Sequence, residues 1–87
     1  MTLDEVIARL SRHGQRATYG AVGAVVGRLA RSVMSGRVKE PRNSWVVSKQ
    51  TGFPTGYSVA QTDPRLTSGK PPLDTEQELR RWLHAHP

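Results

Sequence analysis

Apolar residues recur at helical spacing along the first part of the chain. They are Leu3, Val6, Ile7 and Leu10. With 3.6 residues per turn these positions share one face, which predicts an amphipathic helix that packs on a core. Thr2 and Glu5 have the Thr-x-x-Glu spacing of a capping box, and Gly14 is typical of a helix end. We therefore expect the first helix over residues 2–13.

A second, shorter helix is predicted after Thr18, whose side chain can cap it. Its valine stripe ends at Gly27. Gly20 and Gly23 lie inside this helix, and each lowers helix stability by roughly 1 kcal/mol relative to alanine. Such glycines are tolerable where another backbone packs close to the helix.

Residues 28–36 have the pattern of a third short helix. Leu29 and Val33 are four residues apart and are expected to face the core, while arginines and serines take the other side. Gly36 ends the segment. Two short helices that join at a single glycine, with a basic face on the second, are the pattern of a helix-turn-helix.

A β-hairpin is expected after these helices. Residues 43–48 are rich in β-branched and aromatic side chains and predict a strand in which Trp45 belongs to the core. Residues 50–56 have turn chemistry, and residues 57–59 can return as a second strand. The Phe-Pro pair at 53–54 is either an exposed apolar wedge at the tip or folded back on the domain. A hairpin directly after a helix-turn-helix is a wing.

The rest of the chain predicts an irregular connection and one more helix. Prolines and a glycine interrupt residues 60–73. Thr75 and Glu78 then have capping-box spacing, and Leu79, Trp82 and Leu83 form the apolar face that follows. The predicted fold is α+β. A small winged helix-turn-helix of three helices and a β-hairpin wing spans residues 1–59, and an extra C-terminal helix over residues 74–87 packs on the same single domain.

Composition narrows the function classes. The chain has 87 residues and no cysteine, which fits one domain and excludes disulfides, thiolate catalysis and cysteine metal sites. A reducing cytoplasm is the expected location. No apolar run is long enough to cross a membrane, and the acidic pair Asp4-Glu5 differs from the basic start of a signal peptide.

The net charge of +6 is unevenly distributed. Residues 6–59 carry nine basic side chains and one acid, Glu40, whereas residues 60–87 carry four bases and four acids. A clustered positive field suits a polyphosphate partner, because each phosphate contact releases condensed counterions. A basic surface that serves only solubility fits the charge equally well.

Three short motifs follow one another within residues 3–57. They are Thr18-Tyr19-Gly20, Arg31-Ser32-Val33 and Arg42-Asn43-Ser44-Trp45-Val46-Val47. In this order, with glycines at 27 and 52, they resemble the DNA-binding domain of alkylguanine-DNA alkyltransferases and alkyltransferase-like proteins. That family has Thr-Tyr-Gly, then Arg-Ala-Val, then Pro-Cys-His-Arg-Val-Val, or Pro-Trp-His-Arg-Val-Val in the alkyltransferase-like proteins.

The chain departs from the family at the reactive segment. Asn43 stands at the acceptor-cysteine position, and Ser44 and Trp45 replace the His-Arg pair that activates the cysteine. Alkyl transfer to this chain is therefore not expected. The resemblance implies that Arg31 inserts through the minor groove and fills the space of an extruded nucleotide, and that Tyr19 presses on the adjacent phosphate. The residue pattern alone favours a core position for the Tyr19 ring.

The candidate DNA contacts lie mainly in and after the third predicted helix. Arg31 is the expected specific contact, and the others are expected to contact the DNA backbone, which positions a protein without reading the sequence. The full set is Tyr19, Arg28, Arg31, Ser32, Ser35, Arg37, Lys39, Arg42 and Lys49.

The chain carries no recognisable catalytic signature. The glycines at 20, 23 and 27 do not have dinucleotide-binding spacing, acids are scarce in the basic region, and the histidines are scattered or terminal. We expect a non-enzymatic protein that binds double-stranded DNA without a cofactor or a metal. Two alternatives stay open. One is an alkyltransferase-like sensor of DNA damage that performs no alkyl transfer, and the other is a winged-helix module that binds a protein partner through its C-terminal segment.

Overall fold

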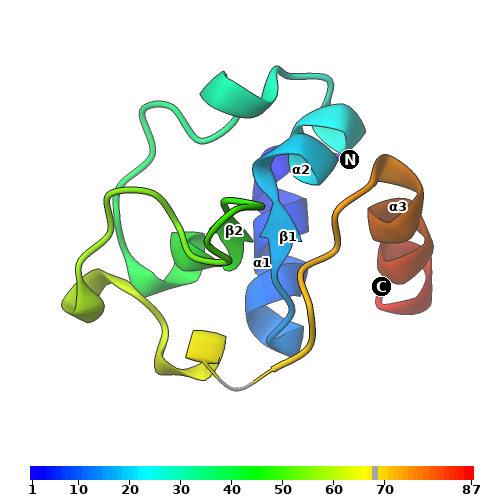
Figure 1. Cartoon of the computed structure of the whole chain (residues 1–87). Coiled ribbons are helices and arrows are strands. Elements are labelled where there is room, and N and C mark those ends of the chain that lie inside the picture. The colour runs from blue at the N-terminus through cyan, green and yellow to red at the C-terminus, as the bar shows by residue number, and fades with distance from the viewer. Residues whose placement is uncertain (68) are drawn as a thin grey trace.

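Three α-helices and a two-stranded parallel sheet form an α+β fold within residues 1–67 and 69–87, which are the residues that the computed structural model describes (Figure 1). The helices are α1 (Leu3–His13), α2 (Tyr19–Val26) and α3 (Glu76–Ala85), and the strands are β1 (Ala17–Thr18) and β2 (Val46–Val47). Short 3-10 helices are η1 (Ala30–Ser32), η2 (Pro41–Trp45), η3 (Val59–Gln61) and η4 (Pro64–Thr67). Of the helices in these residues, none combines the length and the apolar character that crossing a membrane needs.

Helix α1 begins and ends where its local sequence predicts. The Thr2 side chain accepts a hydrogen bond from the Glu5 amide at 3.2 Å, and the Glu5 carboxylate accepts one from the Thr2 amide at 3.3 Å. Gly14 has φ +66°, a left-handed conformation that costs glycine little, and its amide donates to Leu10. The four apolar residues of the predicted face are all buried.

Helix α2 is also confirmed, and the structure explains one of its internal glycines. Thr18 caps the helix by accepting from the Ala21 amide at 3.2 Å, and Gly27 ends it with φ +78°. A Cβ on Gly23 would lie 2.6 Å from the carbonyl oxygen of Arg28, because the chain after the helix returns directly over Gly23. At Gly20 the nearest such atom is a side-chain oxygen at 3.9 Å, so no close backbone explains that glycine.

The prediction of a third helix over residues 28–36 is wrong. Only the three-residue 3-10 helix η1 forms, and turns follow it to Gly36. Val33 is fully buried as expected, but Leu29 is 63% exposed and its backbone is extended, with φ −67° and ψ 143°. Val33 alone buries little apolar surface, and a helix this short is only marginally stable unless it packs along its whole length. This explains why no α-helix forms here.

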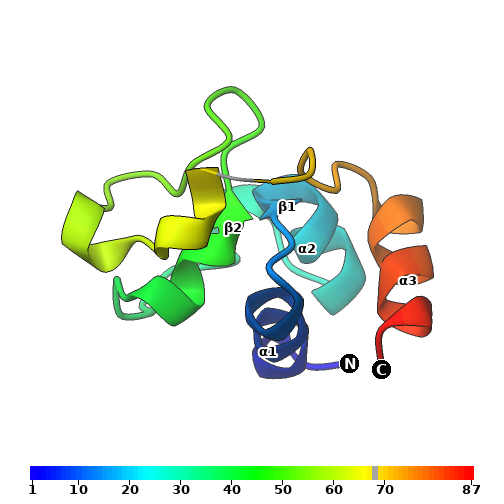
Figure 2. The same ribbon diagram turned by 90° about the horizontal axis from the view of Figure 1, so that it is seen from below.

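The prediction of a β-hairpin wing is wrong as well. Of the strand expected over residues 43–48, only Val46–Val47 form, and residues 43–45 belong to the 3-10 helix η2. Strand β2 pairs in parallel with β1, in the register Ala17 with Val46 and Thr18 with Val47, instead of pairing with residues 57–59. Both residues of β2 are buried, so their backbone groups find partners in the core next to α2. Residues 48–56 instead form a loop that projects from the rest of the ribbon (Figure 2). It is closed by hydrogen bonds from Ser48 to Phe53 and from Gly52 to Ser48.

The C-terminal part packs on the same core. Thr75 and Glu78 form the predicted capping box of α3, and Leu79 and Leu83 are buried, whereas Trp82 is half-buried at the edge. The connection before α3 is not entirely irregular, because Leu73 bridges to β1 through two backbone hydrogen bonds of 2.9 and 3.0 Å. The remaining core residues are Leu3, Val6, Ile7, Leu10, Ala17, Ala21, Val22, Val33, Trp45, Val46, Val47 and Leu66.

Candidate nucleic-acid interface

The turn that replaces the third helix is exposed and basic. Residues 27–32 are all exposed, and they include Arg28, Arg31 and Ser32. The turn lies at one edge of the ribbon in Figure 1, beyond the end of α2. The Ser32 hydroxyl donates to the Leu29 carbonyl at 3.3 Å and so helps to close the turn. Arg28 and Arg31 therefore extend into solvent from a defined backbone.

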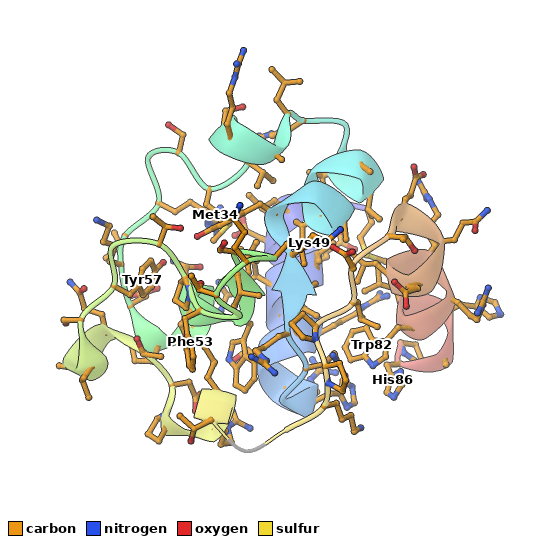
Figure 3. All side chains as sticks on the ribbon, viewed as in Figure 1. Met34, Lys49, Phe53, Tyr57, Trp82 and His86 are labelled. Atoms are coloured by element: carbon orange, nitrogen blue, oxygen red, sulfur yellow. The ribbon has the colours of Figure 1, made fainter. Side chains whose placement is uncertain are left out.

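A groove separates this turn from the loop after β2. Its volume is about 340 Å³, and it is lined by Tyr19, Ala30, Arg31, Met34, Ser35 and Thr55. Met34 lies below the turn in Figure 3, and it is partly buried against the core. Three of the predicted contact residues, Tyr19, Arg31 and Ser35, thus share one concave surface. The lining residues come from three segments of the chain, which are the start of α2, the turn and the loop after β2.

Tyr19 holds the far wall of the groove in place. Its hydroxyl oxygen accepts a hydrogen bond from the Thr55 amide at 2.8 Å, and its half-buried ring packs against the core. A phenol that accepts one hydrogen bond still has its own O–H to donate. Tyr19 can therefore be both a structural residue and a donor to a phosphate oxygen at the edge of the groove.

A second basic group follows the turn, and its members differ in how available they are. Arg37 is only 25% exposed and pairs with Asp4, and the hydrogen bond and charge of Arg37 lower the pKa of the Asp4 carboxyl. Lys39 and Arg42 are exposed, and no ion pair within the described residues involves either of them. The ammonium group of Lys39 lies near Gly56, where an added Cβ would come within 3.1 Å of it.

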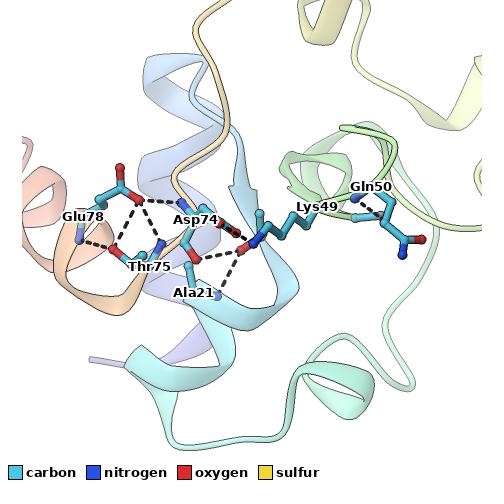
Figure 4. A network of polar contacts seen from close by, with 8 residues as sticks. Ala21, Lys49, Gln50, Asp74, Thr75 and Glu78 are labelled. Atoms are coloured by element: carbon cyan, nitrogen blue, oxygen red, sulfur yellow. Dashed lines mark hydrogen bonds and ion pairs between the residues drawn. The ribbon is translucent and has the colours of Figure 1, made fainter.

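Lys49 belongs to a polar network at the base of the projecting loop (Figure 4). Its ammonium group pairs with the Asp74 carboxylate at 3.1 Å, and the Asp74 carbonyl accepts a hydrogen bond from the Thr18 hydroxyl at 3.5 Å. The network connects the loop after β2 with the first residues of α2 and α3. The Lys49 side chain is 76% exposed, and an ion pair so exposed contributes only about 0–1 kcal/mol. A phosphate can therefore compete for this lysine.

The residues at the family's reactive positions have structural contacts. Asn43 is buried, and its amide nitrogen donates to the Val38 carbonyl at 2.8 Å. Buried Ser44 donates to the Pro41 carbonyl at 2.6 Å and accepts from the Asp63 amide at 3.0 Å. These hydrogen bonds hold η2 against the segments on either side of it. Asn43 is not part of the groove beside Tyr19 and Arg31.

Trp45 is a core residue, as its sequence context predicts. It is 1% exposed, and the Arg65 guanidinium lies over its ring at 5.1 Å from the ring centroid. Arg65 also donates to both carboxylate oxygens of Asp63, which lowers the pKa of that carboxyl. The contact of Trp45 with Arg65 therefore joins η2 to the connection that precedes α3.

Sequence reasoning missed Leu29 and Thr55 as residues of this surface. The i, i+4 spacing of Leu29 and Val33 is the same whether or not the intervening chain is helical, so the pattern could not show that Leu29 faces solvent. Thr55 was part of a stretch with turn chemistry, and its place opposite Tyr19 depends on the fold of the loop. Neither the exposure of Leu29 nor the position of Thr55 could be predicted without the tertiary contacts.

Comparison of the chain with models of protein families, with curated proteins and with solved structures finds no match in any of the three. Function must therefore be argued from the geometry of this surface and from the distribution of charge over it.

Proposed function

We propose that this chain binds double-stranded DNA without enzymatic chemistry, through the short basic turn that follows α2. The observation that carries the proposal is the exposed pair Arg28 and Arg31 on a projecting turn beside a groove. Lys39 and Arg42, both exposed, extend the same basic segment. These four side chains can bind a polyanion, and no group of acidic residues in the same segment neutralises them.

The charge distribution fits a DNA partner. Residues 6–59 contain a single acid, Glu40, among nine bases, whereas residues 60–87, which form the connection and α3, carry equal numbers of acids and bases. Each phosphate that a lysine or arginine neutralises releases counterions, so affinity should fall steeply as salt is added. The remaining proposed contacts are Tyr19, Ser32, Ser35, Arg37 and Lys49, which would bind the sugar-phosphate backbone.

The shape of the turn is compatible with the minor groove. The elements that enter the major groove, about 12 Å wide, are α-helices or β-ribbons, and the three residues of η1 form neither. The family resemblance likewise implies that Arg31 enters the minor groove. In this arrangement Arg31 lies inside the groove, and Arg28 and Lys39 lie near the phosphates.

Fluorescence anisotropy of a labelled duplex, measured at several salt concentrations, tests the proposal. We expect affinity to fall steeply with salt for the native chain. Arg31→Ala should weaken binding strongly and leave the melting temperature almost unchanged, because the side chain is exposed. Arg81→Ala removes an exposed arginine of α3 and is the matched control, for which affinity should change little.

Two results would overturn the proposal. One is the absence of binding at low salt, which would make a protein-interaction module the leading interpretation. The other is an equal loss of affinity in both arginine variants, which would show that only the total charge matters and that the turn is not the DNA interface. Unfolding of Arg31→Ala would contradict the exposed position of that side chain.

The groove favours a second candidate, the recognition of damaged bases. A cavity of about 340 Å³ next to Arg31 and Tyr19 is within the range of small-ligand sites, and it could receive a nucleotide that leaves the duplex. The chain contains no cysteine that could accept an alkyl group, so such a protein would bind a lesion without alkyl transfer. Matched duplexes with guanine or an alkylated guanine separate the two functions. Tighter binding of the alkylated duplex supports damage sensing, and equal affinity supports general DNA binding.

A further inference from the structure

Leu29 is an exposed apolar side chain within the basic turn. It is 63% exposed, whereas most large apolar residues of the chain are buried. Arg28 precedes it, and Ala30 and Arg31 follow it, all of them exposed. An apolar group that is flanked by arginines suits a surface with an apolar interior and an anionic rim. The stacked base pairs and phosphates of a duplex have this arrangement.

The backbone that carries Leu29 cannot retreat into the protein. The Arg28 amide donates to the Gly23 carbonyl at 2.8 Å, and the backbone at 28–30 lies so close to Gly23 that any Cβ there would collide with it. The Ser32 amide and hydroxyl both donate to the Leu29 carbonyl, at 3.1 and 3.3 Å. The turn is therefore held from α2 on one side and from η1 on the other. A side chain on such a support can push against a partner.

We propose that Leu29 is a wedge that inserts between adjacent base pairs from the minor groove and kinks the duplex. This inference depends on the proposed DNA binding and adds a deformation that phosphate contacts alone do not produce. Leucine is among the apolar residues that separate base steps in this way. Burial of the side chain between bases and closer contact of Arg28 with the bent backbone would offset the lost stacking. The flexible pyrimidine–purine steps, TA and CA, are the expected sites.

A doubly labelled duplex with 2-aminopurine at a central TA step tests the wedge. Loss of stacking raises 2-aminopurine fluorescence, and energy transfer between dyes at the two ends reports bending. With the native chain, fluorescence should rise and the two ends should approach each other. Leu29→Ala should bind about tenfold more weakly, which corresponds to loss of a partly buried apolar contact, and should produce neither signal.

Two further variants make the experiment specific. Leu29→Met keeps a long apolar side chain and should retain both signals. Val59→Ala shortens a side chain that is 94% exposed on η3, far from the turn in Figure 1, and should behave like the native chain. Thermal unfolding should be unchanged in all three variants, because each changes an exposed side chain.

The outcomes separate the wedge from DNA binding itself. Salt-dependent binding without a rise in fluorescence overturns the wedge and leaves the proposed function intact. Equal signals from Leu29→Ala and the native chain also overturn the wedge. Absence of binding by the native chain overturns the proposed function and the wedge with it.

Discussion

Substitution of Gly23 by alanine adds one methyl group at the point where the basic turn rests on α2. Its Cβ would lie 2.6 Å from the Arg28 carbonyl oxygen and 3.3 Å from the Ala30 amide nitrogen. Both are backbone atoms, so no side chain can rotate away to relieve the contact. The turn must retreat by most of an ångström, which weakens the hydrogen bond of 2.8 Å from the Arg28 amide to the Gly23 carbonyl.

Two opposing effects set the magnitude. Alanine is favoured over glycine inside a helix by about 1 kcal/mol. Overpacking costs about 1–3 kcal/mol, and a weakened backbone hydrogen bond adds about 1 kcal/mol. The net expectation for Gly23→Ala is a loss of about 1–3 kcal/mol in the free energy of unfolding. For a chain of this size, each kcal/mol corresponds to a fall in melting temperature of about 4–8 °C.

Gly20 provides the control within the same helix. Its Cβ would meet only the Thr18 hydroxyl oxygen, at an ordinary distance of 3.9 Å. Gly20→Ala should therefore leave stability unchanged or raise it by up to about 1 kcal/mol. Urea unfolding followed by circular dichroism would measure both variants, and DNA binding of the folded Gly23→Ala protein would report displacement of the turn.

The sign of the difference between the two variants is decisive. If Gly23→Ala is as stable as Gly20→Ala, then the backbone at 28–30 does not approach the helix as described. The rigid support that we infer for Leu29 would then be lost as well.

Three other substitutions probe separate parts of the structure. Tyr19→Phe removes the hydrogen bond that the Thr55 amide donates to the tyrosine hydroxyl, and it should lower the free energy of unfolding by about 1 kcal/mol and weaken DNA binding. Thermal unfolding and anisotropy measure the two effects, and unchanged values in both would contradict the role of the hydroxyl. Asp74→Asn releases Lys49 from its ion pair and should tighten DNA binding a few-fold while stability changes by less than about 1 kcal/mol, and weaker binding would argue against contact by this lysine. Loss of hydration, followed by the charge of His86, lowers the pKa of His13 in the folded chain. The unfolded chain therefore takes up a proton on His13 more readily, and the free energy of unfolding should fall as the pH drops below about 6.5. In urea unfolding between about pH 7 and pH 5.5, His13→Gln should flatten this decline, and an equally steep decline would refute the role of His13.

The α-helices could be predicted because their ends depend on near neighbours. Thr2, Thr18 and Thr75 each bond an amide three residues later, and the glycines that end α1 and α2 act within one turn. The third helix and the hairpin could not be predicted in the same way. Leu29 and Val33 have identical spacing in a helix and in the observed turn, and only the packing of the chain against Gly23 separates the two cases.

The candidate surface was predictable in charge and not in shape. Arg28, Arg31, Lys39 and Arg42 are exposed, as their positions in a basic segment suggest. The ion pairs of Arg37 and Lys49 join residues that are distant in the sequence, and no local pattern indicates them. The groove likewise needs Tyr19 and the loop after β2 to meet, which depends on the way the loop folds back.

The sequence by itself determined the three α-helices, the buried faces of α1 and α3 and the concentration of positive charge before residue 60. These properties follow from contacts within a few residues or from composition alone. Tertiary structure decided the parallel pairing of β1 with β2, the exposure of Leu29 and the groove beside Arg31. Strands of two residues and a turn of three bury too little surface to specify their own partners. Their conformation is set by the core formed by α1, α2 and α3, against which they pack.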